Sequence, residues 1–254
     1  MRDRWFAIGC ALTFSVLVAG VEVSAEQALP KLILSLGNDS YLPQRAVEEA
    51  TGAQVRRDLG SFDLTDFSLV ILSNISYGNL PSGVQKGLVD FVQQGGSLLV
   101  TGGSRAYGSG GYAGTDISAI LPLKPTRDDW LPHPFGPTLI LQPSHPILQG
   151  VTVLTMAFFN ELDLNSGAIE IAQYRKAAKA AFAGGGDPGG GEIAGGGRRP
   201  MALIAESRSG KGITIAIALD LTQTGNWKDQ NRFVVNTVKY LMDRSTLGPP
   251  KPRK

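Results

Sequence analysis

The chain has 254 residues and a formal net charge of +2, with 24 Lys and Arg residues against 22 Asp and Glu residues. So small an excess of positive charge gives no reason to expect nucleic acid as a partner. The length suits one domain with a sizeable core, and a single cysteine in the whole sequence excludes an intramolecular disulfide.

The first 25 residues have the pattern of a secretory signal peptide. Arg2 and Arg4 precede an apolar run, and Val23-Ser24-Ala25 offers a cleavage site with small residues. The run is about 15 residues long, shorter than the ~20 that span a bilayer, so we expect membrane attachment only if the signal stays uncleaved. Cys10 lies too close to the start for a lipoprotein signal, and it would be lost with the signal. The sequence therefore predicts a periplasmic or secreted bacterial protein that has no thiol.

Apolar runs alternate with amphipathic segments through the first half of the chain. The predicted strands are Lys31–Leu36, Ala53–Arg57, Ser68–Ser73 and Ser97–Thr101, and the predicted helices run from Asp39 or Ser40 to Thr51 and from Leu80 to Gln94. In the second helix, Val84, Leu88 and Phe91 recur at helical spacing. This alternation predicts an α/β domain with a doubly wound, mostly parallel sheet and helices on both faces.

The second half of the chain is less regular. Residues 121–146 are rich in proline and predict a long surface loop that contains one edge strand. Further predicted elements are the edge strand Thr138–Leu141, strands Val151–Thr155 and Ala168–Tyr174, a hairpin of Met201–Ala205 and Gly212–Leu219, and a last helix Lys228–Met242. Asn160-Glu161-Leu162-Asp163 places Glu161 and Asp163 on one face of a further strand.

Two segments have compositions that do not suit a packed core. Residues 184–197 read GGGDPGGGEIAGGG, which cannot offset its ordering entropy by burial, so we predict a flexible insertion within a domain that covers residues 26–245. Residues 246–254 end in a short basic stretch, which we predict to be a disordered tail.

Several fragments resemble the class I glutamine amidotransferase-like superfamily, especially its trehalose-utilisation-like branch. They are FSLVILSNI, LPSGVQKGLVDFVQQGGSLLVTGG, GSGGYAGTDISAILPL, SHPILQG and SRSGKGITIAIALD, and they occur in this order over most of residues 30–243. The resemblance implies a flavodoxin-like fold.

Active enzymes of that superfamily carry a Cys in the turn after the strand that corresponds to Ser97–Thr101. Here the turn reads Thr101-Gly102-Gly103-Ser104. The resemblance therefore implies a pseudoenzyme without glutaminase activity and without a cofactor. Our leading hypothesis is an exported, non-catalytic module of the cell envelope that binds a protein partner or a small polar ligand.

The glycine-rich turn is the predicted ligand site. Gly102, Gly103, Ser104, Arg105 and Tyr112 lie where open α/β sheets bind ligands, and exposed N–H groups ahead of a helix near Thr115 would suit an anion or a sugar hydroxyl. In the alternative interpretation the glycines only permit a tight turn with positive φ angles.

A competing hypothesis is a hydrolase or carbohydrate-active enzyme of the trehalose-utilisation-like branch. Ser104 with His145, or carboxylates such as Asp116 and Glu161, would then perform the chemistry. The other interpretation of His145 is that it braces a turn through backbone hydrogen bonds. No spacing in the sequence predicts a metal site. A structural role in an envelope complex is a third hypothesis, because relatives of this kind accompany von Willebrand-type domains.

Overall fold

The structure is a computed structural model that describes residues 29–126, 129–132, 138–174 and 200–250. The predicted signal peptide, Cys10, the glycine-rich insertion at 184–197 and the last four residues of the predicted tail lie outside the described residues. Within the described part, no helix is long and apolar enough to cross a membrane.

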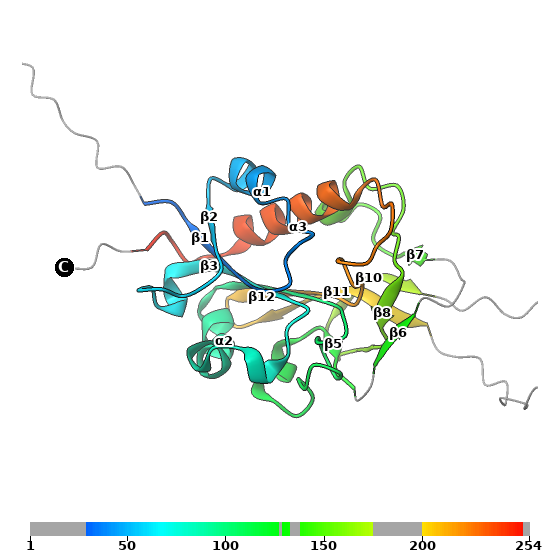
Figure 1. The fold of residues 1–254 in the computed structure, drawn as a ribbon, viewed down its shortest axis with the longest axis horizontal. Helices are drawn as coiled ribbons and strands as arrows, with labels where there is room; N and C mark the ends of the chain where they lie inside the picture. The colour runs from blue at the N-terminus through cyan, green and yellow to red at the C-terminus, as the bar shows by residue number, and fades with distance from the viewer. Residues whose placement is uncertain (1–28, 127–128, 133–137, 175–199, 251–254) are drawn as a thin grey trace, which may run out of the picture.

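An eight-stranded sheet forms the centre of the molecule (Figure 1). Its strands are β1 (Leu32–Gly37), β2 (Gln54–Arg56), β3 (Phe67–Ser73), β4 (Ser97–Thr101), β7 (Thr138–Ile140), β10 (Ile169–Tyr174), β11 (Met201–Ser209) and β12 (Gly212–Ile217). They lie in the order β2-β1-β3-β4-β12-β11-β10-β7. In this order, the first five strands, β2 to β12, are parallel to one another. Strands β11, β10 and β7 extend the sheet in antiparallel fashion. The prediction of a mostly parallel sheet is confirmed.

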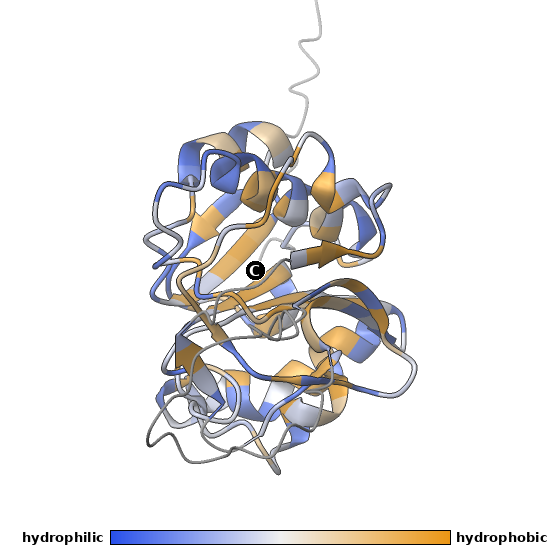
Figure 2. Ribbon diagram, turned by 90° about the vertical axis from the view of Figure 1, so that its right-hand side faces the viewer, coloured by the Kyte–Doolittle hydropathy of each residue, from blue (hydrophilic) through white to orange (hydrophobic). Residues whose placement is uncertain are grey.

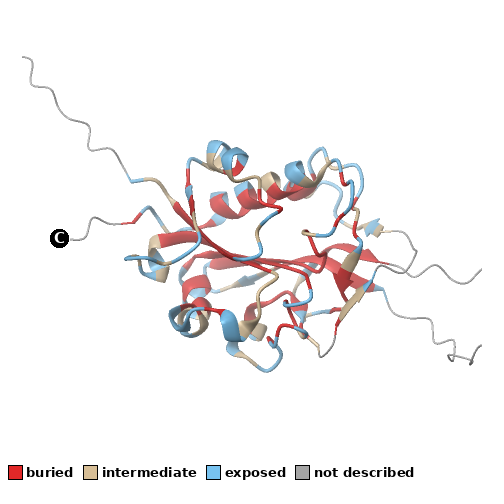
Figure 3. Cartoon of the chain, in the orientation of Figure 1, coloured by how far each residue is buried: buried red, intermediate tan, exposed pale blue. Residues whose placement is uncertain are grey.

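Helices cover both faces of this sheet. Helices α1 (Gln44–Thr51) and α3 (Gln230–Arg244) lie together on one face, and α2 (Ser82–Gln94) lies on the other (Figure 1). The strands are mostly hydrophobic (Figure 2), and buried residues line them and the helix sides that face them (Figure 3). The fold is therefore the flavodoxin-like α/β arrangement that the sequence predicts.

The central elements follow directly from the sequence pattern. All seven residues of β3 are buried, as expected for a strand covered on both faces. Helix α2 buries the predicted stripe of Val84, Leu88, Phe91 and Val92, and it ends at Gly95, which adopts φ 117°.

The first helix begins later than predicted. Residues between β1 and Gln44 form a turn in which the Leu42 N–H donates to the Asp39 carbonyl at 2.8 Å. Pro43 follows directly, and a residue that precedes proline disfavours the helical conformation. The helix can therefore start only at Gln44.

The predicted strand Val151–Thr155 is wrong. Instead, the Thr152 N–H donates to the Asp229 carboxylate at 2.9 Å, and the Trp227 indole donates to the Val153 carbonyl at 2.7 Å. Because side chains just before α3 take these backbone groups, the segment does not pair with a strand.

The described parts of the proline-rich region contain short strands as well as loop. The region contains β5 (Leu123–Lys124) and β6 (Trp130–Pro132) besides the edge strand β7, which is confirmed. β6 pairs with β8 (Phe158–Asn160), and β5 pairs with β9 (Asp163–Leu164). Glu161 therefore lies between two strands, and its predicted place on one strand face with Asp163 is wrong.

The hairpin of β11 and β12 has a tighter turn than the predicted strands Met201–Ala205 and Gly212–Leu219 leave between them. β11 continues to Ser209, which pairs with Gly212, so the turn needs only two residues. Gly210 adopts φ 59°, and such a conformation suits a two-residue hairpin turn.

Candidate functional site

The strand order places a topological switch point between β1 and β3. From β1 the chain moves to β2 on one side, and it then returns to β3 on the other side. In open α/β sheets, ligands bind at the carboxyl ends of the strands beside such a point. A ligand site is therefore expected at the loops that follow β1 and β3.

A cleft of about 310 Å³ lies at this switch point, lined by Gly37, Asn38, Asn74, Ile75, Asn79 and Arg105. Gly37 ends β1, and Asn74 follows β3 directly. Arg105 comes from the loop after β4, so the ends of three neighbouring strands contribute to the cleft.

Asn74 has an unusual backbone conformation. It adopts φ 43°, and its side-chain Oδ1 accepts a hydrogen bond from the Arg105 N–H at 2.7 Å. Asparagine tolerates this left-handed conformation better than most residues, but the position remains a local strain of the kind that gathers at functional sites. The bond ties the β3 loop to the β4 loop across the cleft.

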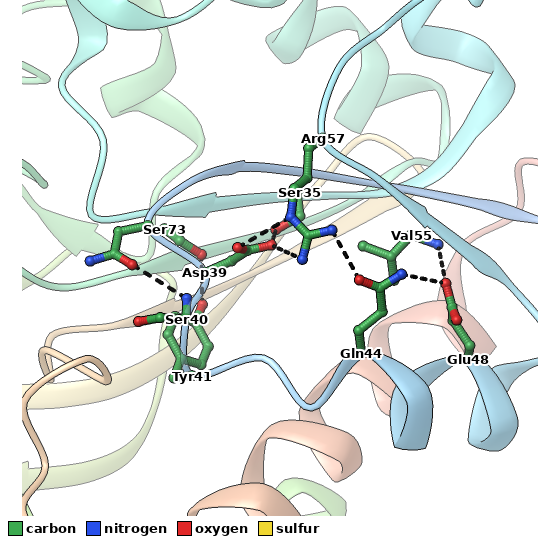
Figure 4. A network of polar contacts seen from close by, with 10 residues as sticks. Ser35, Asp39, Ser40, Tyr41, Gln44, Glu48, Val55, Arg57 and Ser73 are labelled. Atoms are coloured by element: carbon green, nitrogen blue, oxygen red, sulfur yellow. Dashed lines mark hydrogen bonds and ion pairs between the residues drawn. The ribbon is translucent and has the colours of Figure 1, made fainter.

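A polar network fixes the turn after β1 (Figure 4). Asp39 accepts a hydrogen bond from Ser35 Oγ at 2.9 Å and forms an ion pair with Arg57 at 3.2 Å. Arg57 also donates to Gln44 Oε1 at 2.9 Å. The carboxylate next to Asn38 in the sequence is thus already neutralised by partners of its own.

Tyr41 supports the strand ends from the buried side. Its hydroxyl forms hydrogen bonds with Ser73 Oγ at 2.7 Å and with Thr101 Oγ1 at 3.4 Å. Burial is the main reason that the pKa of Tyr41 rises to about 12. The hydroxyl therefore remains protonated at neutral pH and is unsuited to act as a base.

The glycine turn itself is filled from inside the protein. Gly102 and Gly103 are buried, and Asn160 both accepts from the Gly103 N–H at 2.9 Å and donates to the Gly103 carbonyl at 3.2 Å. Gly103 adopts φ 143°, and a Cβ there would lie 2.2 Å from the Asn74 side chain. Glycine is required at this point because of both the conformation and the close approach of Asn74.

A buried carboxylate occupies the next part of the same loop. Asp129, which is 2% exposed, accepts from the N–H groups of Gly108 at 2.8 Å and Ser109 at 3.2 Å, and from the Asn160 amide at 2.8 Å. The loop does form an anion-binding arrangement of N–H groups, but the anion is a side chain of this protein.

The five predicted ligand residues therefore lie in different surroundings. Gly102, Gly103 and Tyr112 are buried, and the Tyr112 hydroxyl donates to the Ile75 carbonyl at 2.9 Å. Ser104 and Arg105 are exposed, and of the five only Arg105 lines the cleft.

His145 has partners other than Ser104. Its Nδ1 accepts from the Ile147 N–H at 3.4 Å at the start of a 3-10 helix (Pro146–Leu148), and its Nε2 lies 3.3 Å from Glu206 Oε2. Among the described contacts none joins His145 to Ser104. The interpretation in which His145 braces a turn through the backbone agrees with this geometry.

Glu206 links this histidine to the last helix. Its carboxylate also accepts from the Tyr240 hydroxyl at 2.5 Å, and the rings of His145 and Tyr240 lie 4.8 Å apart. Burial alone would raise the pKa of Glu206, but the hydrogen bonds from His145 and Tyr240 and the charge of Arg208 outweigh it, so the pKa lies below its ordinary value.

The two candidate carboxylates have no hydrogen bond or ion pair with Ser104 or His145 among the described residues. Asp116 is exposed at the first position of a 3-10 helix (Asp116–Ile120). The Glu161 N–H donates to the Asp129 carbonyl at 2.6 Å. No group of three metal-ligating side chains occurs among the residues that the structure describes.

Sequence reasoning missed the three asparagines of the cleft. A usable signal was present, because Asn38 and Asn74 each come at or just after the carboxyl end of a predicted buried strand. The missing information was which two strands flank the switch point, and only the topology supplies it.

No model of a known protein family matches the sequence, and no curated protein matches it. Solved structures do match its fold. A cytoplasmic protein of Salmonella typhimurium is 14% identical over 83% of this chain and 98% of its own, with a TM-score of 0.60. A ThuA-like protein of Bacteroides uniformis is 13% identical over 91% of this chain and 99% of its own, with a TM-score of 0.55.

A β-galactosidase of Rahnella sp. R3 is also similar, at 15% identity and a TM-score of 0.50, over 87% of this chain but only 32% of the enzyme. Identities this low establish a shared fold and nothing finer. The chain therefore has the flavodoxin-like α/β fold of ThuA-like proteins, which is consistent with the trehalose-utilisation-like branch that the sequence resembles.

Proposed function

We propose that this protein is a non-catalytic binding module that holds a small polar ligand in the cleft between the ends of β1 and β3. The observation that carries the proposal is the position of a polar cleft at the topological switch point. The absence of Cys from the turn after β4 argues against glutaminase chemistry.

Export to the cell envelope is a separate part of the proposal. It rests on the sequence pattern of residues 1–25 alone. The fold carries no information about location, since one similar structure belongs to a protein called cytoplasmic. Fusion of residues 1–30 to a reporter that is active only outside the cytoplasm tests it, and a reporter that stays inactive would contradict it.

Ligand binding can be tested with a panel of small polar molecules. We expect at least one neutral sugar, sugar acid, sugar phosphate or amino acid to raise the melting temperature of the purified protein and to give a binding isotherm in calorimetry. If no member of the panel binds, and envelope proteins are captured in its place, the cleft is not the functional site.

The absence of glutaminase activity has its own assay. The purified protein should release no more ammonia from glutamine than a heat-inactivated sample. Release above that control would contradict the non-catalytic assignment.

The competing hydrolase hypothesis needs a base beside Ser104. Ile147 and Glu206 engage the two ring nitrogens of His145, and Ser104 has no hydrogen-bond partner within the described part of the chain. No observation of the geometry favours this second function.

A further inference from the structure

We infer that the ligand of this cleft carries an anionic group, either a phosphate, a sulfate or a carboxylate. The inference rests on the proposed function and deepens it. It follows from which hydrogen-bonding atoms of the cleft are already occupied and which are left.

Asn38 is a lining residue of the cleft whose amide oxygen already accepts a hydrogen bond. Its Oδ1 accepts a hydrogen bond from the Ser40 N–H at 3.3 Å, which fixes the orientation of the amide. Its Nδ2 has no partner among the described residues.

Asn74 has the same arrangement. Its Oδ1 accepts from the Arg105 N–H at 2.7 Å, and its Nδ2 has no partner in the described part of the chain. In two side chains from the ends of different strands, the amide oxygen thus already accepts one backbone hydrogen bond, whereas the amide nitrogen has no partner among the described residues.

Arg105 adds a cation that has no counter-ion. Its side chain is exposed, and within the described ranges it forms no hydrogen bond or ion pair. A guanidinium offers only donors, and its planar fork matches the oxygens of a carboxylate or a phosphate.

The lining carries no negative charge that would repel an anionic ligand. None of the six lining residues is acidic. The Ile75 carbonyl already accepts from Tyr112, and the neighbouring Asp39 is paired with Arg57. Only the Asn79 side chain keeps a free amide oxygen among the described lining residues.

A surplus of donors selects the ligand chemistry. A neutral sugar brings hydroxyls that both donate and accept, so many of its donors would find no acceptor here. An anionic group brings acceptors alone, and its hydrogen bonds to charged donors are the stronger ones.

The test compares three compounds that share one ring and differ in charge: glucose, glucose 6-phosphate and glucuronate. By calorimetry at low salt, at least one of the two anions should bind the purified protein about tenfold or more tightly than glucose. The affinities for glucose 6-phosphate and glucuronate show whether a phosphate or a carboxylate is preferred. The affinity should fall as salt is added, because the site is open to solvent.

Two variants locate the effect. Arg105→Ala should weaken binding of the preferred anion about tenfold or more. Arg45→Ala removes the same charge from an exposed α1 residue whose side chain is 92% exposed and which does not line the cleft, so it should leave the affinity unchanged.

Each contrary result has one meaning. Equal affinity for glucose and both anions, or equal loss in both variants, would overturn the inference but leave the proposed function standing. If glucose binds and neither anion does, the inference is likewise overturned and the proposed function stands. If no compound binds, neither these three nor any other member of the panel of small polar molecules, the proposed function is contradicted as well.

Discussion

The glycine turn after β4 and the cleft beside it are neighbouring polar regions that differ in how their hydrogen-bonding groups are used. In the turn, Asn160 and Asp129 satisfy the N–H groups of Gly103, Gly108 and Ser109. In the cleft, the donors of Asn38, Asn74 and Arg105 have no partner among the described residues. The N–H groups of the turn are thus satisfied by side chains of this protein, whereas the side-chain donors of the cleft remain available to a ligand.

This difference also revises the role expected of the glycine turn. A part-buried loop with positive φ angles and N–H groups aimed at a carboxylate has the form of an anion site, but Asp129 already fills it. The turn therefore shapes the cleft, because it fixes the backbone at Arg105 through Asn74.

The largest effect is expected from Gly103→Ala. The new Cβ would lie 2.2 Å from Asn74 at a φ of 143°, so we predict a loss of about 3 kcal/mol or more in the free energy of unfolding. Chemical denaturation measures it. Gly78→Ala is the matched control, since a Cβ there meets nothing within 4 Å. Equal stability of the two variants would show that the turn is not constrained.

Asp129→Ala should have the next largest effect. It leaves the part-buried N–H groups of Gly108 and Ser109 without their acceptor, which costs about 1–2 kcal/mol. Hydrogen exchange at those two amides should also become faster. Asp163→Ala, at an exposed position of β9, serves as the control. Unchanged exchange in the Asp129 variant would contradict the saturated state of the turn.

Glu206 offers a smaller effect that depends on pH. Its pKa lies below the ordinary 4.5, so it stabilises the folded state fully above about pH 4.5, and this contribution is lost as the pH falls through the lowered pKa. Glu206→Gln should cost about 1 kcal/mol at neutral pH, and the difference from the unchanged protein should shrink on acidification. Denaturation curves between pH 3 and pH 7 test this, and a constant difference across that window would be the contrary result.

Ser104→Ala should have the smallest effect. Ser104 is exposed and has no hydrogen bond among the described residues, so stability should change by less than about 0.5 kcal/mol and ligand binding should persist. If the wild-type protein turned over a substrate and Ser104→Ala abolished that activity, the hydrolase hypothesis would be supported instead.

The sequence was most informative where one physical effect dominates. Buried strands such as β3 and β4 are short continuous apolar runs, and α2 shows a regular helical stripe, so burial alone predicts them. The start of α1 and the segment 151–155 were mispredicted because a proline and the side chain of Asp229 decide the backbone there.

The candidate site could be predicted only in part from the sequence. The position of Arg105 after β4 could be read from the sequence, and its role in ligand binding stays a prediction. The partners of Gly103 and Gly108 could not be read in this way, because Asn160 and Asp129 lie far away in the sequence. Contacts at such separation depend on the arrangement of β6 and β8, which the proline-rich composition conceals.

The most direct test is an NMR titration of the isotope-labelled protein with the preferred anion. We predict that the side-chain amides of Asn38 and Asn74 and the Arg105 guanidinium shift progressively, whereas the backbone amides of Gly108 and Ser109 keep their positions. Shifts confined to Gly108 and Ser109, with the cleft side chains unmoved, would contradict the central claim that the turn is filled and the cleft is free.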